Sequence, residues 1–257
     1  MKGKMKAIVY HGQNDLRLEE LDTPETGPKD VLLKTKSAST CGSDLHAARR
    51  GPKWAKAEKQ IFGHEFAAEI AEVGSEITRY KVGDRVFGVN MAFCGECWYC
   101  RHQDYAHCTG VGDHYTGQGI PGACAQYFKF TDPESEYAFA PYLNSLMPIP
   151  DEMTDEQCAM MEPFGVGLGA VNKAGVKEGD TVVILGTGII GISSLQWCKA
   201  RGARVIVVGR GRHRLDIAKK CGADHVVSTL DGDCYEQVAA LTEETGGDWG
   251  KEAPTRD

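Results

Sequence analysis

The pattern of apolar and polar positions changes near residue 152. Before it, short segments of alternating character predict strands at residues 6–10, 31–38, 66–73 and 85–89. Residues 109–150 are rich in Gly, Pro, Tyr and Phe and fit no regular element, which predicts loops around a site. We therefore expect a β-rich first domain over residues 1–152.

After residue 152 longer apolar segments alternate between helix and strand periodicity. Residues 154–173 have a helical pattern that Pro163, Gly165, Gly167 and Gly169 are expected to bend or break. The next elements, in order, are strand 181–185, helix 189–201, strand 204–208, helix 212–221, strand 225–227 and helix 234–244. Strands that alternate with helices predict a parallel sheet with right-handed crossovers. Residues 153–257 are therefore expected to form one half of a doubly wound α/β domain.

Composition and charge exclude several classes of protein. The chain has 257 residues, of which 42% are apolar and 25% charged, as in globular proteins. Its 36 acidic and 29 basic residues give a net charge of -7 without a dense basic run, which argues against a nucleic-acid or membrane partner. Neither a signal peptide nor a membrane-spanning apolar run is present in the sequence, so we expect a cytoplasmic protein.

Four of the ten cysteines lie close together, at Cys94, Cys97, Cys100 and Cys108. In a chain of this length such a group favours reduced thiols that bind metal over a disulfide framework. Four thiolates can close around one tetrahedral zinc ion and leave no position for a substrate, which indicates a structural site in a lobe over residues 94–108. The alternative is four unrelated core residues. His102 and His107 are expected to be surface residues.

A second, more dispersed set has the mixed donors of a catalytic zinc. It contains Cys41 in Thr-Cys-Gly-Ser-Asp-Leu-His, His64 and Glu65 in Gly-His-Glu, and Glu162 in Met-Glu-Pro. A thiolate, an imidazole and carboxylates are typical ligands of a zinc that keeps one position open. Taken singly, each residue could be a buried thiol, a hydrogen-bonded histidine or a helix-surface carboxylate. The interpretation depends on their joint occurrence.

The segment Gly186-Thr187-Gly188-Ile189-Ile190-Gly191 follows an apolar strand and opens an apolar helix. In that setting the three glycines indicate a dinucleotide-binding loop, with phosphates at the helix N-terminus. A purely structural turn is the alternative.

The end of the next strand bears on the choice of nucleotide. Enzymes that use NAD commonly place Asp or Glu there, whereas this chain has Gly209 followed by Arg210 and Arg212. Guanidinium groups suit a 2′-phosphate, so we favour NADP over NAD. The alternative is that both arginines are simply solvated.

Together these motifs resemble the zinc-dependent medium-chain dehydrogenases. Cys-Gly-Ser-Asp-x-His, Gly-His-Glu, the four-cysteine lobe, Val-Gly-Asp-Arg-Val and Gly-x-Gly-x-x-Gly occur in the family's order between residues 5 and about 247. Glu65 and the pair Glu162-Pro163 resemble the polyol (sorbitol-type) and threonine dehydrogenase branch. The resemblance implies a GroES-like catalytic domain followed by a Rossmann domain, which here is incomplete.

The resemblance also implies a reaction and its zinc ligands. Two zinc ions are expected, one catalytic and one structural. The catalytic zinc acts as a Lewis acid while hydride passes between a secondary alcohol or polyol and NAD(P). Cys41 and His64 correspond to ligands. Glu65 and Glu162 would share the remaining position, because both carboxylates plus a thiolate would leave the site with a charge of -1.

Three more residues take roles by the same resemblance. Ser43 corresponds to the start of a proton relay and His46 to its outer end, although Ser43 could instead cap the following helix. Asp44 corresponds to a carboxylate that orients His64.

The chain departs from the family in two places. Ala68 stands where glycine is usual, and we expect a small local shift there. The polar residues 251–257 replace an expected apolar strand, so strand 181–185 should lack a neighbour on one side. We interpret this as truncation. The full-length protein is expected to be a homo-oligomer, whereas the state of this chain, like its substrate, is not readable from the sequence.

Two other functions stay open at this stage. One is a catalytically impaired fragment that keeps the structural zinc and part of the nucleotide site. The other is zinc-free quinone reduction on the same fold, against which Cys41, His64 and the four cysteines argue.

Overall fold

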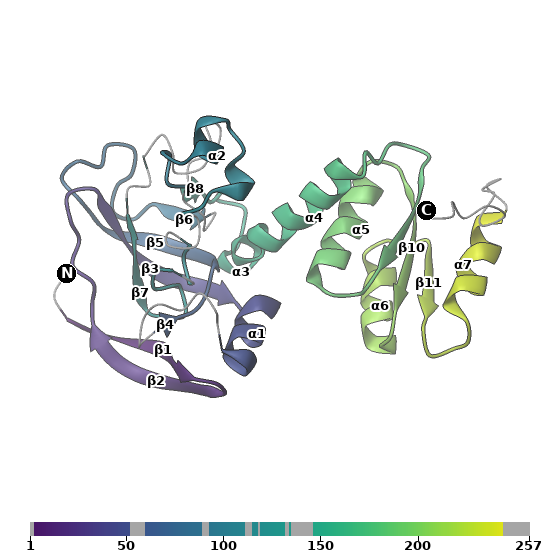
Figure 1. The fold of residues 1–257 in the computed structure, drawn as a ribbon, viewed down its shortest axis with the longest axis horizontal. Helices are drawn as coiled ribbons and strands as arrows, with labels where there is room; N and C mark the ends of the chain where they lie inside the picture. The colour runs from purple at the N-terminus through teal and green to yellow at the C-terminus, as the bar shows by residue number, and fades with distance from the viewer. Residues whose placement is uncertain are drawn as a thin grey trace. The chain divides into compact units, whose positions relative to one another are not determined.

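The computed structural model describes residues 3–51, 60–88, 93–110, 115–117, 119–131, 134 and 146–243. The chain divides into two compact units after Glu162, later than the boundary expected at 152 (Figure 1). The segment just before this boundary therefore belongs with the β-rich unit. The polar tail singled out in the sequence, residues 251–257, lies outside the described residues.

The first unit is built on two antiparallel sheets. The larger has the order β7-β3-β5-β6-β8 and the smaller the order β2-β1-β4. Their strands are β1 (Lys4–Gly12), β2 (Asp15–Asp22), β3 (Asp30–Ser39), β4 (Gln60–Ile61), β5 (Glu65–Val73), β6 (Arg85–Gly88), β7 (Tyr127–Thr131) and β8 (Leu146–Pro148). The helices are α1 (Gly42–Arg50), α2 (Trp98–Arg101), the 3-10 turn η1 (Tyr105–His107) and α3 (Asp155–Ala159). The four predicted strands are confirmed as β1, β3, β5 and β6, with residue 89 outside the described residues.

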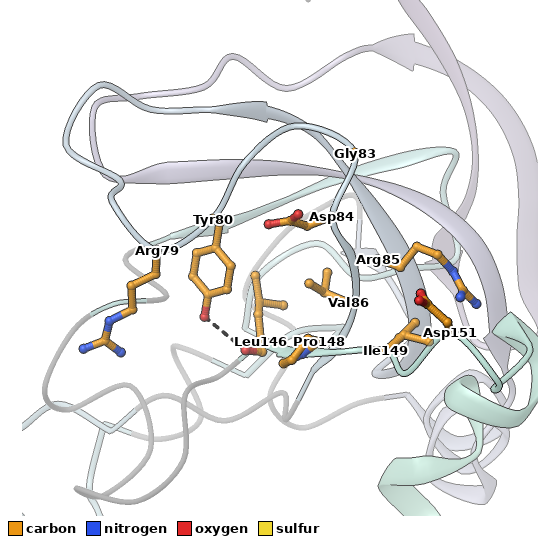
Figure 2. Close-up of a pocket in the computed structure, with 10 residues that line it drawn as sticks. All are labelled: Arg79, Tyr80, Gly83, Asp84, Arg85, Val86, Leu146, Pro148, Ile149 and Asp151. Atoms are coloured by element: carbon orange, nitrogen blue, oxygen red, sulfur yellow. Dashed lines mark hydrogen bonds between the residues drawn. The ribbon is translucent and has the colours of Figure 1, made fainter.

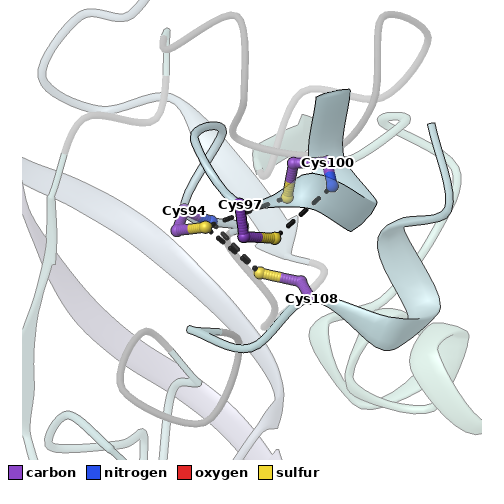
Figure 3. A group of neighbouring side chains, drawn as sticks. All are labelled: Cys94, Cys97, Cys100 and Cys108. Atoms are coloured by element: carbon purple, nitrogen blue, oxygen red, sulfur yellow. Dashed lines mark hydrogen bonds between the residues drawn. The ribbon is translucent and has the colours of Figure 1, made fainter. Parts of the chain in front are cut away.

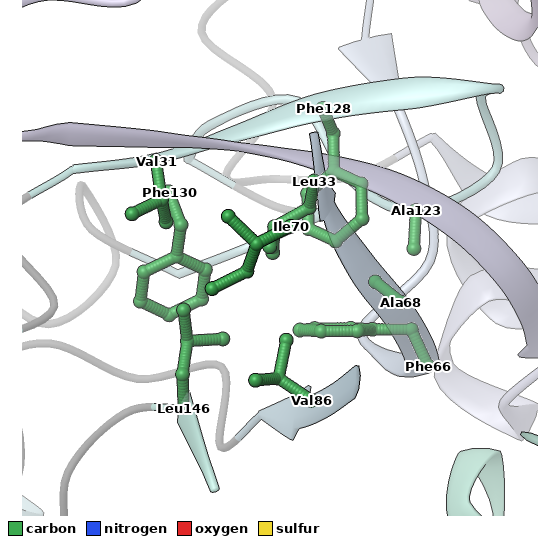
Figure 4. Packing of buried hydrophobic residues seen from close by; sticks show 10 residues of the cluster. All are labelled: Val31, Leu33, Phe66, Ala68, Ile70, Val86, Ala123, Phe128, Phe130 and Leu146. Atoms are coloured by element: carbon green, nitrogen blue, oxygen red, sulfur yellow. The ribbon is translucent and has the colours of Figure 1, made fainter. Parts of the chain in front are cut away.

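The core of this unit follows the alternation along β5. Phe66, Ala68 and Ile70 are each at most 1% exposed and face the same side, where Phe66 packs edge-to-face on Phe128 with ring centroids 4.8 Å apart (Figure 4). The Ala68 methyl is part of this core. The register of β3 against β5 shifts opposite it, between Thr35 and Ser37.

A surface depression of about 470 Å³ lies where β6 meets β8. Tyr80 crosses it and donates a hydrogen bond from its hydroxyl to the carbonyl of Leu146 at 3.0 Å (Figure 2). None of its lining residues is a predicted ligand or nucleotide-binding residue, so the depression is separate from the predicted chemistry.

The second unit is a parallel sheet covered by helices on both faces, as predicted. Its elements are α4 (Met161–Lys173), β9 (Thr181–Leu185), α5 (Ile189–Ala200), β10 (Arg204–Gly209), α6 (Arg212–Lys220), β11 (His225–Ser228) and α7 (Cys234–Glu243). The strand order is β11-β10-β9, with parallel pairing throughout. Val205 and Val207 of β10 pack toward α4, α5 and α6, whereas Ile206 and Val208 pack toward α7. No helix among the described residues is long and apolar enough to cross a membrane.

Helix α4 corrects one expectation. The predicted break at Pro163 or the three glycines is wrong, because one helix runs from Met161 to Lys173 and the interruption falls at Met160. Pro163 lies in the first turn, where its missing N–H would have no helical partner in any case.

Strand β9 lies at one edge of the described sheet. In the described sheet its only neighbour is β10, the side chains of residues 181–184 are half-buried, and Leu185 is 81% exposed.

The glycines of α4 differ in what they touch. A Cβ at Gly167 would lie 2.3 Å from Ser193 Oγ and 2.9 Å from the Ser194 nitrogen of α5, whereas a Cβ at Gly169 would meet nothing within 4 Å. Gly167 therefore permits the close approach of α4 to α5, and Gly169 does not contribute to it.

Substitution of these two glycines should change stability in opposite directions. We expect Gly167→Ala to lower the free energy of unfolding of the second unit by about 1–3 kcal/mol, because the helices must separate. Gly169→Ala is the matched control and should raise it by about 0.5–1 kcal/mol through helix propensity. Denaturant unfolding followed by circular dichroism measures both, and equal effects would contradict the assigned contact.

Candidate metal centres and nucleotide loop

The four cysteines of residues 94–108 converge on one point. Their Sγ atoms all lie within 4.8 Å of one another, with Cys94 Sγ 3.6 Å from Cys108 Sγ and 3.9 Å from Cys100 Sγ (Figure 3). Sulfurs bound tetrahedrally at about 2.3 Å from a zinc ion would be about 3.8 Å apart. The thiols are too far apart for disulfides and are all free. The donor set therefore fits a closed zinc site.

The local backbone favours thiolates at this site. The Cys100 N–H points at Cys97 Sγ at 3.4 Å, and with the Thr109 N–H it holds the pKa of the Cys97 thiol below its usual range. The Cys94 N–H approaches Cys108 Sγ in the same way at 3.4 Å. Burial acts in the opposite direction on Cys100 and raises its pKa. A bound cation would offset that penalty.

Among the described residues, the interior of the lobe consists mostly of its own cysteines. Its buried residues are Phe93, Cys100 and Cys108, with Cys94, Cys97 and Tyr105 packed against them.

His102 and His107 lie outside this group of thiols, as expected. Both side chains are exposed: His102 stacks on Trp98 with ring centroids 4.0 Å apart, and His107 pairs with Asp104 at 2.8 Å.

Three of the four residues in the second predicted set lie close together. Donor atoms of Cys41, His64 and Glu65 all lie within 4.8 Å of one another. Cys41 is the N-cap of α1, so its side chain lies at the N-terminal end of that helix. His64 immediately precedes β5 and Glu65 is its first residue, and the two are only 2% and 3% exposed.

The electric field at His64 favours a positive charge. Asp44 is buried beside it, with Asp44 Oδ1 3.4 Å from His64 Nδ1, a distance too long for a well-formed hydrogen bond. Burial lowers the pKa of His64, but Asp44 and Cys41 outweigh burial and raise the pKa to about 10. An imidazole buried next to a thiol and a carboxylate, with a second carboxylate facing its Nδ1, fits a metal cation at this place.

The two glutamates have different surroundings. The Ser39 hydroxyl donates to Glu65 Oε2, and Ser39 pairs with Glu65 across β3 and β5. Glu162 is half-buried at the start of α4 and is outside the three-residue group of close donors. Its pKa is raised, chiefly by burial, while the nearby charge of His64 lowers it and those of Glu65 and Asp44 raise it further. Glu162 is thus within electrostatic range of the cluster.

The residues assigned to a proton relay lie on α1. Ser43 and His46 are both exposed. The alternative that Ser43 caps α1 is wrong, because the cap is Cys41, whose backbone N–H donates to Asp44 Oδ2 at 3.0 Å. Asp44 thus contacts both the Cys41 backbone and the His64 ring.

Sequence reasoning missed Ser39 and the backbone packing before His64. A Cβ at Gly122 would lie 2.3 Å from the Gly63 carbonyl oxygen, and one at Gly117 would lie 2.7 Å from the same atom. Tyr115, in this segment, has its ring centroid 5.8 Å from that of His64. Clustered glycines between residues 109 and 122 were a visible signal in the sequence, but only the fold shows that Gly117 and Gly122 pack on residue 63.

The predicted nucleotide loop joins β9 to α5. Gly186 has a φ of +111°, which favours glycine, and a Cβ at Gly191 would lie 2.1 Å from the Gly186 carbonyl oxygen. Gly188 is the N-cap of α5 without a side-chain cap, and nothing lies within 4 Å of where its Cβ would be. Ile189 and Ile190 in the first turn are 40% and 37% exposed. The helix N-terminus is therefore open to an anion.

The end of β10 is close to this loop. Gly209 is the last residue of β10, and the N–H of Gly186 donates to the carbonyl of neighbouring Val208 at 2.8 Å. Arg210 and Arg212 follow with exposed side chains, and Arg212 approaches Asp231 only loosely, at 3.8 Å. A pair this exposed is weak and can be exchanged for another anion.

Comparisons with known proteins show which family the chain belongs to. Residues 27–141 match the alcohol dehydrogenase GroES-like domain, and residues 190–250 match the zinc-binding dehydrogenase family. The chain is 34% identical to sorbitol dehydrogenase of Bacillus subtilis (strain 168), covering 95% of this chain and 67% of that protein. It is 36% identical to L-threonine 3-dehydrogenase of Rhizobium etli (strain CIAT 652), covering 98% of this chain and 70% of that protein.

A solved structure extends the comparison to three dimensions. A protein of Sinorhizobium meliloti 1021 described as a zinc-binding dehydrogenase and bound to NADP is 27% identical, with a TM-score of 0.81, covering 91% of this chain and 64% of that one. The chain thus spans about two thirds of the length of these relatives. It belongs to the zinc-dependent medium-chain dehydrogenases, and within them it is similar to the sorbitol and threonine dehydrogenases.

Proposed function

We propose that this chain takes part in zinc- and NADP-dependent oxidation of a small secondary alcohol or polyol. The observation that carries the proposal is the convergence of Cys41, His64 and Glu65, donors from separate segments, on one buried point. The names of the similar proteins, a sorbitol and a threonine dehydrogenase, support an alcohol substrate.

Zinc would be held by Cys41, His64 and one carboxylate, and when bound it would act as a Lewis acid on the alcohol. Asp44 orients the His64 ring and holds the backbone of Cys41 through its second oxygen. Ser39 holds one oxygen of Glu65. One carboxylate with one thiolate balances the charge of a divalent ion, so Glu65 and Glu162 would serve in turn rather than together.

Ser43 and His46 would carry the substrate's hydroxyl proton toward solvent. Their positions on α1, directly after Cys41, and the exposure of His46 support that direction. The four-cysteine lobe would hold a second, structural zinc, because four sulfurs leave no position for a substrate.

For the nucleotide we propose NADP. Its phosphates would lie at the N-terminus of α5, and its 2′-phosphate near Arg210 and Arg212. The absence of a carboxylate at Gly209 and the NADP bound to the Sinorhizobium meliloti protein support this choice.

Zinc content tests the two metal sites separately. We expect the unsubstituted chain to bind two zinc ions. Cys41→Ser, His64→Ala and Cys108→Ser should each reduce the count to one, because each change removes a donor from one site only. Cys221→Ser, outside both groups, is the matched control and should keep two. Elemental analysis after dialysis gives the counts. Two ions in both the Cys41 and His64 variants would refute the catalytic ligand set.

Nucleotide titration tests the arginines. We expect Arg210→Ala and Arg212→Ala each to weaken NADP⁺ binding about tenfold and to leave NAD⁺ binding within about twofold, because only the 2′-phosphate contacts a guanidinium. Lys220→Ala, at the opposite end of α6, controls for net charge. Isothermal titration calorimetry measures both constants. Equal losses for the two nucleotides would show that the arginines do not read the 2′-phosphate.

Turnover tests the reaction itself. A preparation with two zinc ions, given NADP⁺ and a panel of 2,3-diols, polyols and threonine, should form NADPH, and Cys41→Ser should abolish it. A folded preparation with both zinc ions that forms no NADPH on any member of the panel would favour the alternative, a chain that binds zinc and nucleotide without catalysis.

A further inference from the structure

Glycine is favoured at position 209 by lack of space and not by the backbone conformation. Its φ lies outside the left-handed region that favours glycine, since it ends a regular parallel strand. A Cβ at this position would lie 2.5 Å from Thr187 Cγ2 and 3.0 Å from Thr187 Oγ1. Leu215 Cδ2 would be 3.2 Å away. The space beside Gly209 is therefore filled mainly by the side chain of Thr187.

The loop that carries Thr187 is held on two sides. The Gly186 N–H bonds to the Val208 carbonyl at 2.8 Å, which ties the loop to the end of β10. On the other side the Gly186 carbonyl packs so closely on α5 that a Cβ at Gly191 would lie 2.1 Å from it. Thr187 is β-branched, so its χ1 angle is stiff. The loop cannot easily retreat from a larger residue at position 209.

Position 209 is where a carboxylate would bind the adenosine ribose of NAD and repel the 2′-phosphate of NADP. We propose that Thr187 is a specificity-determining residue: its side chain fills the space that the carboxylate-bearing side chain needs, and so keeps the chain in its NADP-binding form. Residues 187 and 209 then act as one steric pair, and a change of cofactor requires both to change. This inference rests on the nucleotide preference proposed above.

Two sets of variants test the pair. Stability is measured on Gly209→Ala, Thr187→Ala and the double variant by thermal unfolding, without nucleotide. We expect Gly209→Ala to lower the Tm and Thr187→Ala to restore it in the double variant, because the methyl at 209 then has room. Leu215→Val combined with Gly209→Ala is the matched control and should restore less, since Leu215 is the more distant and flexible neighbour. If the change in Tm of the double variant equals the sum of the two single changes, residues 187 and 209 do not act as a steric pair.

Nucleotide choice is measured by calorimetry with NAD⁺ and NADP⁺. We expect Gly209→Asp alone to weaken NADP⁺ without gain for NAD⁺, and Thr187→Ala with Gly209→Asp to bind NAD⁺ at least about tenfold more tightly than the single variant. An equal gain of NAD⁺ binding by Gly209→Asp alone would overturn the role of Thr187. If the NADP proposal is wrong, the unsubstituted protein will bind NAD⁺ at least as tightly as NADP⁺. The Tm series tests the contact between Thr187 and Gly209 independently of that result.

Discussion

The antiparallel register of β3 against β5 is the constraint on which the candidate catalytic site depends. Pairing of Ser39 with Glu65 brings the end of one strand beside the beginning of the other. Cys41 follows the first strand and His64 precedes the second, so residues distant in sequence become neighbours without a dedicated loop. A one-residue shift of β5 against β3 would turn every side chain of β5 to the opposite face of the sheet. Burial of the apolar face of β5 therefore fixes the register, and with it the positions of the metal donors.

Much of the second unit could be predicted from sequence because its signals are local. The run of buried residues in β10 and the glycines before α5 specify strand, turn and helix within a few residues of the chain. The first unit is harder, because strands such as β2, with charged residues on an exposed face, and β8, with three residues, are defined by their partners. The predicted position of the interruption in helix 154–173 was wrong because it too depends on the fold. Pro163 is harmless in a first turn, and only the structure shows where that turn begins.

The site could be predicted as a set of residues but not as an arrangement. Cys41, His64 and Glu65 were identified together, and their donor atoms do meet. Sequence could not show two details of the arrangement. Glu162 is outside the group of close donors that includes Glu65, and Ser39 supplies a hydrogen bond that no motif indicates. The pairing of Thr187 with Gly209 is similar, since the distances between their atoms exist only in the folded chain.

The two donor clusters differ in what surrounds them, so the zinc ions proposed for them would have different thermodynamic roles. Cys41, His64 and Glu65 lie at the ends of β3 and β5, beside an apolar core that does not include them. The lobe of residues 94–108 instead has its own cysteines as most of its interior. Four thiolates in so small an interior would repel one another without a cation, so capture of a zinc ion would be coupled to deprotonation of the thiols and to ordering of the lobe, as in zinc fingers. Removal of zinc by a chelator would therefore unfold the lobe, whereas the site of Cys41, His64 and Glu65 would keep its arrangement without the ion.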